Sequence, residues 1–109
     1  MASMTDAFAD KLEPDLAQFE INAGMWRLEA DRHLHRLRED AAIGIDPVAI
    51  DPARVTLEGI GFEIDRIQAF ARDHIGIADT SLLRLAEVGL ALETARRRLV
   101  RALTAQPQS

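Results

Sequence analysis

Apolar positions in the first forty residues recur at alternating steps of four and three, which is the spacing of one face of an α-helix. Pro14 lies inside this pattern, and proline suits only the first turn of a helix. We therefore expect a short N-terminal helix or arm over residues 1–13 and a main helix over about 14–42, ended by Gly44. If the two segments are coaxial, they share one apolar seam and Pro14 marks a kink. The positions of this first seam are Phe8, Leu12, Leu16, Phe19, Ala23, Trp26, Ala30, His33 and Leu37.

The same helix carries a second apolar group, formed by Ile21, Met25 and Leu28. At about 100° per residue these side chains point almost opposite to Phe19 and Trp26. A helix that is apolar on two sides needs neighbours on two sides, and one layer of helices from the same chain covers only one. The pattern therefore predicts self-association, with these five residues at the oligomer interface.

Two further apolar seams predict helices over about 52–75 and 81–104. The seam of the second helix is Leu57, Ile60, Ile64, Ile67, Ala71 and Ile75. The seam of the third is Leu82, Leu85, Val88, Leu92, Ala95, Leu99 and Leu103. Gly59 and Gly61 weaken the second helix, so we interpret them as sites of close helix approach, the alternative being a break at 59–61.

Turn residues separate the three helices. The connector repeats the phrase Ile-Asp-Pro at 45–47 and 50–52, and the second copy has the cap and first-turn residues of a helix start. Gly76 followed by an apolar residue is typical of a left-handed helix end. Asp79, Thr80 and Ser81 offer side-chain caps for the third helix. We expect a frayed tail over 106–109.

These elements predict an all-α fold, a three-helix up-down-up bundle with a long first helix that assembles into a helical homo-oligomer. The five-residue turn before the third helix makes the last two helices an antiparallel hairpin. Residues 14–105 form one domain. The first helix is longer than the hairpin, and an overhanging end that carries Phe8 and Leu12 is a second reason to expect a partner chain. A dimer with six helices is the simplest such assembly.

Composition narrows the function classes. The chain has 109 residues, a formal net charge of −5 and no cysteine. The negative charge disfavours non-specific contact with nucleic acid or an anionic membrane. We expect a cytoplasmic protein with no membrane partner, because no apolar run approaches the ~20 residues of a membrane span. Twelve of the thirteen basic residues are Arg, which indicates a GC-rich bacterial genome.

Three charged or titratable residues fall in or beside the apolar seams. Arg96 projects between leucines of the third helix, His33 lies within the first seam, and Glu63 flanks the second. We hypothesise a polar layer of His33, Glu63 and Arg96 that crosses the bundle or its oligomer interface and fixes register. The alternative is that Arg96 extends its alkyl stem outward to water and His33 is half exposed.

The sharpest local charge is the arginine cluster of the third helix. Arg97, Arg98 and Arg101 fall on the side away from the seam. They suggest a docking face for phosphate or carboxylate, which guanidinium groups bind in bidentate fashion. The alternative is that these cations suit a helix C-terminus and pair with acids of neighbouring helices.

From the sequence we predict no catalytic residue, no cofactor site and no metal site. Glu29 and His33 are four residues apart, as are Asp31 and His35, so each pair shares a helical face. Di-iron bundles instead use Glu-x-x-His with carboxylates from other helices. A solvated charged face is therefore the preferred interpretation.

The expected layout, a long first helix followed by two shorter ones in a dimer, resembles that of the helical chorismate mutases. That resemblance implies an enzyme that holds two substrate carboxylates with Arg and Lys side chains. Lys11 is the only base in the first turns, and Arg27 and Arg38 lie on a plausible face. Gly59 and Gly61 stand where an Arg-Glu pair would be wanted, so no catalytic residue is carried over.

Three functions follow, in order of preference. The first is a non-enzymatic α-helical interaction or assembly adaptor whose partners are itself and another protein. The second is a DNA-packaging adaptor of phage-like particles, similar to small terminase subunits in size and helix count, with the arginine face on phosphates. The third is a small helical enzyme with the mutase layout.

Overall fold

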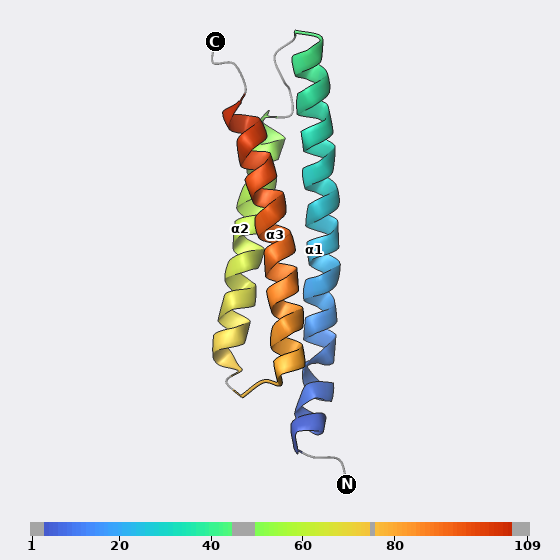
Figure 1. Ribbon diagram of the computed structural model, residues 1–109, viewed down its shortest axis with the longest axis vertical. Coiled ribbons are helices and arrows are strands. Elements are labelled where there is room, and N and C mark those ends of the chain that lie inside the picture. The colour runs from blue at the N-terminus through green and yellow to red at the C-terminus, as the bar shows by residue number, and fades with distance from the viewer. Residues whose placement is uncertain (1–3, 45–49, 75, 106–109) are drawn as a thin grey trace.

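The chain folds into a bundle of three α-helices (Figure 1). The computed structural model describes residues 4–44, 50–74 and 76–105, with side chains from residue 11 onward. Helix α1 spans Met4–Ala42, α2 spans Ile50–Asp73 and α3 spans Asp79–Thr104. The described residues contain no strand, so the all-α expectation is confirmed. The molecule is a rod of 65 × 19 × 16 Å.

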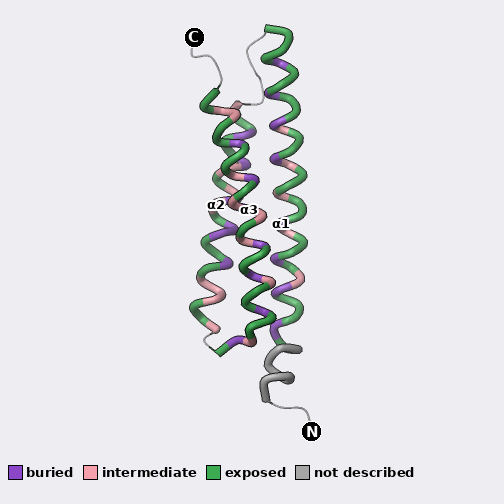
Figure 2. Tube along the Cα trace, viewed as in Figure 1, coloured by how far each residue is buried: buried purple, intermediate pink, exposed green. Residues whose placement is uncertain are grey.

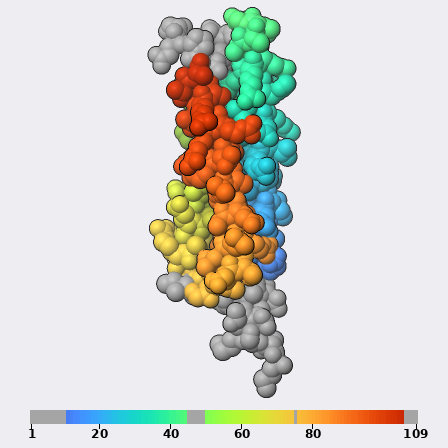
Figure 3. All heavy atoms as spheres, viewed as in Figure 1, coloured from blue at the N-terminus to red at the C-terminus, as the bar shows by residue number. Residues whose placement is uncertain are grey.

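Contacts between α1 and α2 show that these helices run in opposite chain directions. Trp26 of α1 packs on Gly59 of α2, and His33 further along α1 meets Thr56. Helix α3 lies against both and runs in the same direction as α1 (Figure 1). Figure 3 looks onto the face where α3 covers the junction of the other two helices. The opposite edge of the α1–α2 junction is consequently left without a third helix.

The three predicted seams meet in one core, and buried positions recur along the inward sides of the helices (Figure 2). Periodicity predicted most of its members correctly. The buried apolar residues are Leu12, Leu16, Phe19, Ala23, Ala30, Leu34, Leu37, Ala53, Ile60, Ile64, Ile67, Ile77, Leu85, Val88, Leu92, Ala95 and Leu99. Thr56, Glu63 and Ser81 are buried polar residues that the apolar pattern did not include.

Helix α1 is continuous through Pro14, whereas the sequence suggested a separate segment before it. A proline inside a helix removes one backbone hydrogen bond and clashes with the preceding turn, at a cost of roughly 3 kcal/mol. Leu12 and Leu16 on either side are both buried, and their burial offsets this cost. Leu12 therefore lies within the core of one chain and does not need a partner chain to cover it.

Two glycines after helices have the left-handed backbone that was predicted, although α2 ends at Asp73, earlier than the predicted residue 75. Gly44 and Gly76 have φ of +76° and +91°, and the apolar follower Ile77 is buried. The predicted cap of α3 is wrong. Its N-cap is Ala78, whose side chain makes no capping hydrogen bond.

The start of the third seam was also assigned to the wrong residue. Ser81 is buried and Leu82 is 41 % exposed. Eleven residues make three helical turns, so Ser81, not Leu82, lies in phase with Leu92. The predictions for Phe8, the first Ile-Asp-Pro phrase at 45–47, Ile75 and the tail 106–109 lie outside the described residues or side chains.

Candidate functional site

A groove of about 670 Å³ runs between α1 and α2. Its apolar walls are formed by Met25 and Trp26 from α1 and by Val55 and Phe62 from α2. Glu29 and Glu58 lie at its rim. The groove lies on the edge of the bundle that α3 does not cover, and two of the predicted interface residues, Met25 and Trp26, line it.

Two of the residues that line the groove, Trp26 and Gly59, pack directly on each other. A Cβ at position 59 would overlap the indole, with Cζ2 and Cζ3 only 2.8 Å away. Close helix approach at Gly59 is thus confirmed, and α2 is unbroken there. Gly61 is less constrained, since a Cβ would meet only Arg96 Nη1 at 3.7 Å.

Large apolar side chains around the groove face solvent. Met25, Val55 and Phe62 are 62 %, 66 % and 68 % exposed, and Ile21 and Leu28 continue the surface around α1 at 55 % and 63 %. We call these five residues the α1–α2 face. Val55 and Phe62 are seven residues apart on one side of α2 and lie off its seam. Sequence reasoning missed them because it considered a second apolar side only for the first helix.

One member of the predicted interface lies elsewhere. Phe19 is 6 % exposed and packs edge to face on Phe70, with ring centroids 5.3 Å apart. Arg66 covers it at 5.8 Å from the ring centroid. Phe19 therefore belongs to the core of the single chain, whereas Trp26 is half-buried at the floor of the groove.

A polar network closes one end of the groove around a buried carboxylate. Glu63 is 4 % exposed and accepts hydrogen bonds from Asn22 Nδ2 at 2.9 Å and from Arg66 Nη1 at 3.3 Å. Gln18 Nε2 donates in turn to Asn22 Oδ1 at 2.8 Å. The carboxylate is thus paired within one chain, which reduces the desolvation penalty of burying it.

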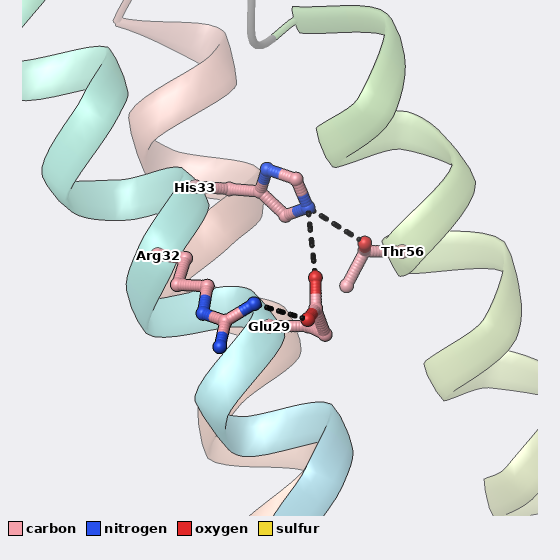
Figure 4. Close-up of polar contacts among 4 residues, drawn as sticks. All are labelled: Glu29, Arg32, His33 and Thr56. Atoms are coloured by element: carbon pink, nitrogen blue, oxygen red, sulfur yellow. Dashed lines mark hydrogen bonds and ion pairs between the residues drawn. The ribbon is translucent and has the colours of Figure 1, made fainter.

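The predicted polar layer does not form within the chain, because its three members have other partners. His33 Nε2 shares a 2.9 Å hydrogen bond with Thr56 Oγ1 and lies 3.9 Å from Glu29 Oε2 (Figure 4). Arg96 donates to Glu93 at 2.8 Å and keeps 40 % of its side chain exposed, as the snorkelling alternative expected.

Glu63 is not part of a layer with His33 because the two residues lie at different levels along the bundle axis. It lies opposite Asn22, and Asn22 is eleven residues from His33 along α1. At 1.5 Å per residue this separation is about 16 Å. The sequence did not determine the axial offset between α1 and α2. The prediction that Glu63 lies at the level of His33 was therefore wrong.

The arginine cluster is exposed and only partly paired. Arg97, Arg98 and Arg101 all face solvent, and Arg98 lies 3.6 Å from Asp31 of α1. Arg98 and Arg101 also border a second hollow between α1 and α3, which Arg38 of α1 completes. Arg97 is not part of its lining.

Metal-ligand geometry is not found in the described part of the chain, where no three His, Cys, Asp or Glu residues cluster. His35 pairs with Glu39 at 3.0 Å, and Asp31 faces Arg98 instead. Among residues 4–44, 50–74 and 76–105, no helix combines the length and apolar character that a bilayer crossing requires.

The described residues present two surface features, one on each side of α1. Between α1 and α2 lies an exposed apolar face beside a groove. Between α1 and α3 lies a hollow lined by arginines. Comparison with models of known protein families, with curated proteins and with solved structures finds no match to this chain.

Proposed function

We propose that the chain is a non-enzymatic helical assembly module, which pairs with a second copy of itself through the α1–α2 face. The observation that carries this proposal is the exposure of Met25, Val55 and Phe62 around a groove whose floor is Trp26. Contiguous apolar surfaces of this kind mark interaction sites in soluble proteins.

The shape of the face favours a second copy as its occupant. Phe62 and Met25 are more than 60 % exposed, and the groove that they border is a recess in the same patch. A two-fold axis brings the same patch of both subunits together, so a projection and a recess in one patch satisfy each other twice. The result is a closed six-helix dimer of up-down-up bundles, which then presents its remaining surface to another protein as an adaptor.

The energetics are of the right order. Two copies of the face bring together ten large side chains, each more than half exposed in the single chain. Burial of such side chains contributes roughly 1 kcal/mol or more each, on the order of 10 kcal/mol in total. Association costs ~4–15 kcal/mol in lost freedom, so the burial gain exceeds the cost over the lower part of that range and a reversible dimer is expected.

Substitution of Phe62 tests the proposal. Phe62→Lys places a charge in the proposed interface and should convert the dimer to monomer in size exclusion with light scattering. The matched control is Leu90→Lys, at a residue 65 % exposed on α3 and outside the face. Both variants should retain the helical circular dichroism of the folded bundle, and only Phe62→Lys should run as a monomer. Equal dissociation by both variants, or by neither, contradicts the proposal.

A further inference from the structure

The second hollow, between α1 and α3, brings three arginines from two helices together. Its volume is about 510 Å³, and Arg38, Arg98 and Arg101 border it. Its other walls are short or apolar, with Leu37, Ala41 and Ala102 among them. Leu37 is fully buried beneath, so the floor belongs to the core and is held in place.

The cations of this hollow exceed the acids that face them. Asp31 is within ion-pair distance of Arg98, at 3.6 Å. Arg38 and Arg101 form no ion pair with any residue in the described ranges. Three guanidinium groups against one carboxylate leave a local excess of positive charge in a chain whose net charge is −5.

The number and type of donors select the ligand. Each guanidinium presents a planar fork of N–H donors that matches two oxygens of an anion. A carboxylate has two oxygens and one charge, and one arginine satisfies it. A phosphate monoester or free phosphate has three or four acceptor oxygens and more than one negative charge at neutral pH, which suits several arginines at once.

We propose that this hollow binds a phosphate dianion, held by Arg38, Arg98 and Arg101. The small side chains Ala41 and Ala102 leave room beside the anion for an apolar substituent of an organic phosphate. The site lies at the α1–α3 junction, away from the α1–α2 face, so this proposal and the self-association proposal can fail independently.

The test is a titration of the full chain with inorganic phosphate at constant ionic strength, followed by amide chemical shifts of Ala41, Ala102 and Ala105. We expect saturable shifts at these residues. Arg38→Gln and Arg101→Gln should each weaken phosphate binding by roughly five- to tenfold, as expected for the loss of a charge-assisted hydrogen-bond pair. Arg97→Gln is the matched control, because it removes a neighbouring exposed arginine outside the hollow, and it should leave binding unchanged.

Two further probes separate the sources of phosphate. Phenyl phosphate binding more tightly than inorganic phosphate assigns the site to organic phosphates, and equal binding assigns it to the free anion. Absence of saturable shifts overturns the proposal. So does an equal loss in the Arg97→Gln variant, because the effect is then general charge. Tight binding of a single-stranded oligonucleotide that depends on Arg97 as much as on Arg101 also overturns it, in favour of an outer nucleic-acid face.

Discussion

The two junctions that α1 makes with its neighbours differ in how complete they are within one chain. At the α1–α3 junction, some surface charges pair across the helices, and the arginines that do not pair are exposed to water. Arg84 binds both Glu13 and Glu20, and Arg98 faces Asp31. At the α1–α2 junction the outer edge is apolar and exposed to solvent. The large side chains Met25 and Phe62 there are more than 60 % exposed.

The difference follows from what each junction places on its outer edge. Long charged side chains reach water while their stems cover the joint, so the α1–α3 edge is satisfied without further protein. Apolar side chains gain free energy only when another surface covers them. The α1–α3 edge is therefore complete in a single chain, whereas the α1–α2 edge is not. Substitutions should change stability by unequal amounts at the two edges.

The largest effect is expected for Gly59→Ala. In most helices this change stabilises, by up to about 1 kcal/mol. Here the added methyl overlaps the Trp26 indole, so we expect destabilisation by about 1–3 kcal/mol in urea unfolding and a red shift of tryptophan fluorescence.

Gly89→Ala is the matched control for this change. A Cβ at position 89 of α3 meets no atom within 4 Å, so the substitution should be neutral or stabilising. Equal stabilisation by the two alanines would show that Trp26 does not depend on Gly59.

A smaller loss is expected from Asn22→Ala, because the Glu63 carboxylate keeps one donor. The change removes one of the two donors to the buried carboxylate of Glu63 and leaves Arg66 as its partner. An unsatisfied buried acceptor costs about 1–3 kcal/mol of unfolding free energy, and the loss here should lie toward the lower end of that range. Gln18→Ala, at an exposed residue that touches only the outer end of the network, serves as the control and should change stability little. Similar losses in both variants would argue against a special role for the buried carboxylate.

Thr56→Val should cost about 1 kcal/mol in thermal or urea unfolding, because it removes the hydroxyl that bonds half-buried His33 while keeping the volume. The comparison is Thr94→Val on the solvent side of α3, where the hydroxyl bonds only the Leu90 carbonyl of its own helix. If the valine at 94 is as harmful as the one at 56, the loss reflects helix propensity and not the junction.

The smallest effect on stability is expected at the α1–α3 edge, for Arg84→Met. The hydrogen bond from Arg84 lowers the pKa of Glu13 below its ordinary value of 4.5. Because the folded pKa is lowered, the ion pair stabilises the fold above the unfolded pKa and is lost as pH falls through the folded pKa. The melting temperature of the variant should be slightly reduced at pH 7, and its difference from the parent chain should shrink below about pH 4.5.

Arg36→Met, at an exposed arginine without an ion pair in the described ranges, is the control for general charge effects. It should show no such pH dependence. A difference at Arg84 that persists unchanged at pH 3 would contradict the role assigned to Glu13.

The sequence predicted the helices and their buried sides because both depend on local periodicity. Leu16, Ile60 and Leu92 fall in their seams and are at most 2 % exposed. The approach at Gly59 was also predicted, since an unfavourable residue inside a helix points to a packing need. Of the two arrangements considered at Pro14, the structure has the coaxial one, because burial on both sides of the proline outweighs its local penalty.

The candidate site was predicted only in part because it depends on the axial offset between helices. Periodicity gives the direction in which a side chain points and not the level of its neighbour on another helix. Met25 and Trp26 were assigned to an interface from their directions, whereas the pairing of Glu63 with Asn22 required the offset. The position of Arg38 beside the arginines of α3 was not predicted either, because it depends on the axial offset between α1 and α3.

The mass of the chain in solution tests the central claim most directly. Sedimentation equilibrium over a wide concentration range should give twice the chain mass of 12.1 kDa at high concentration, with dissociation on dilution. A folded species of 12.1 kDa at every concentration, with Met25 and Phe62 in water, would contradict the account.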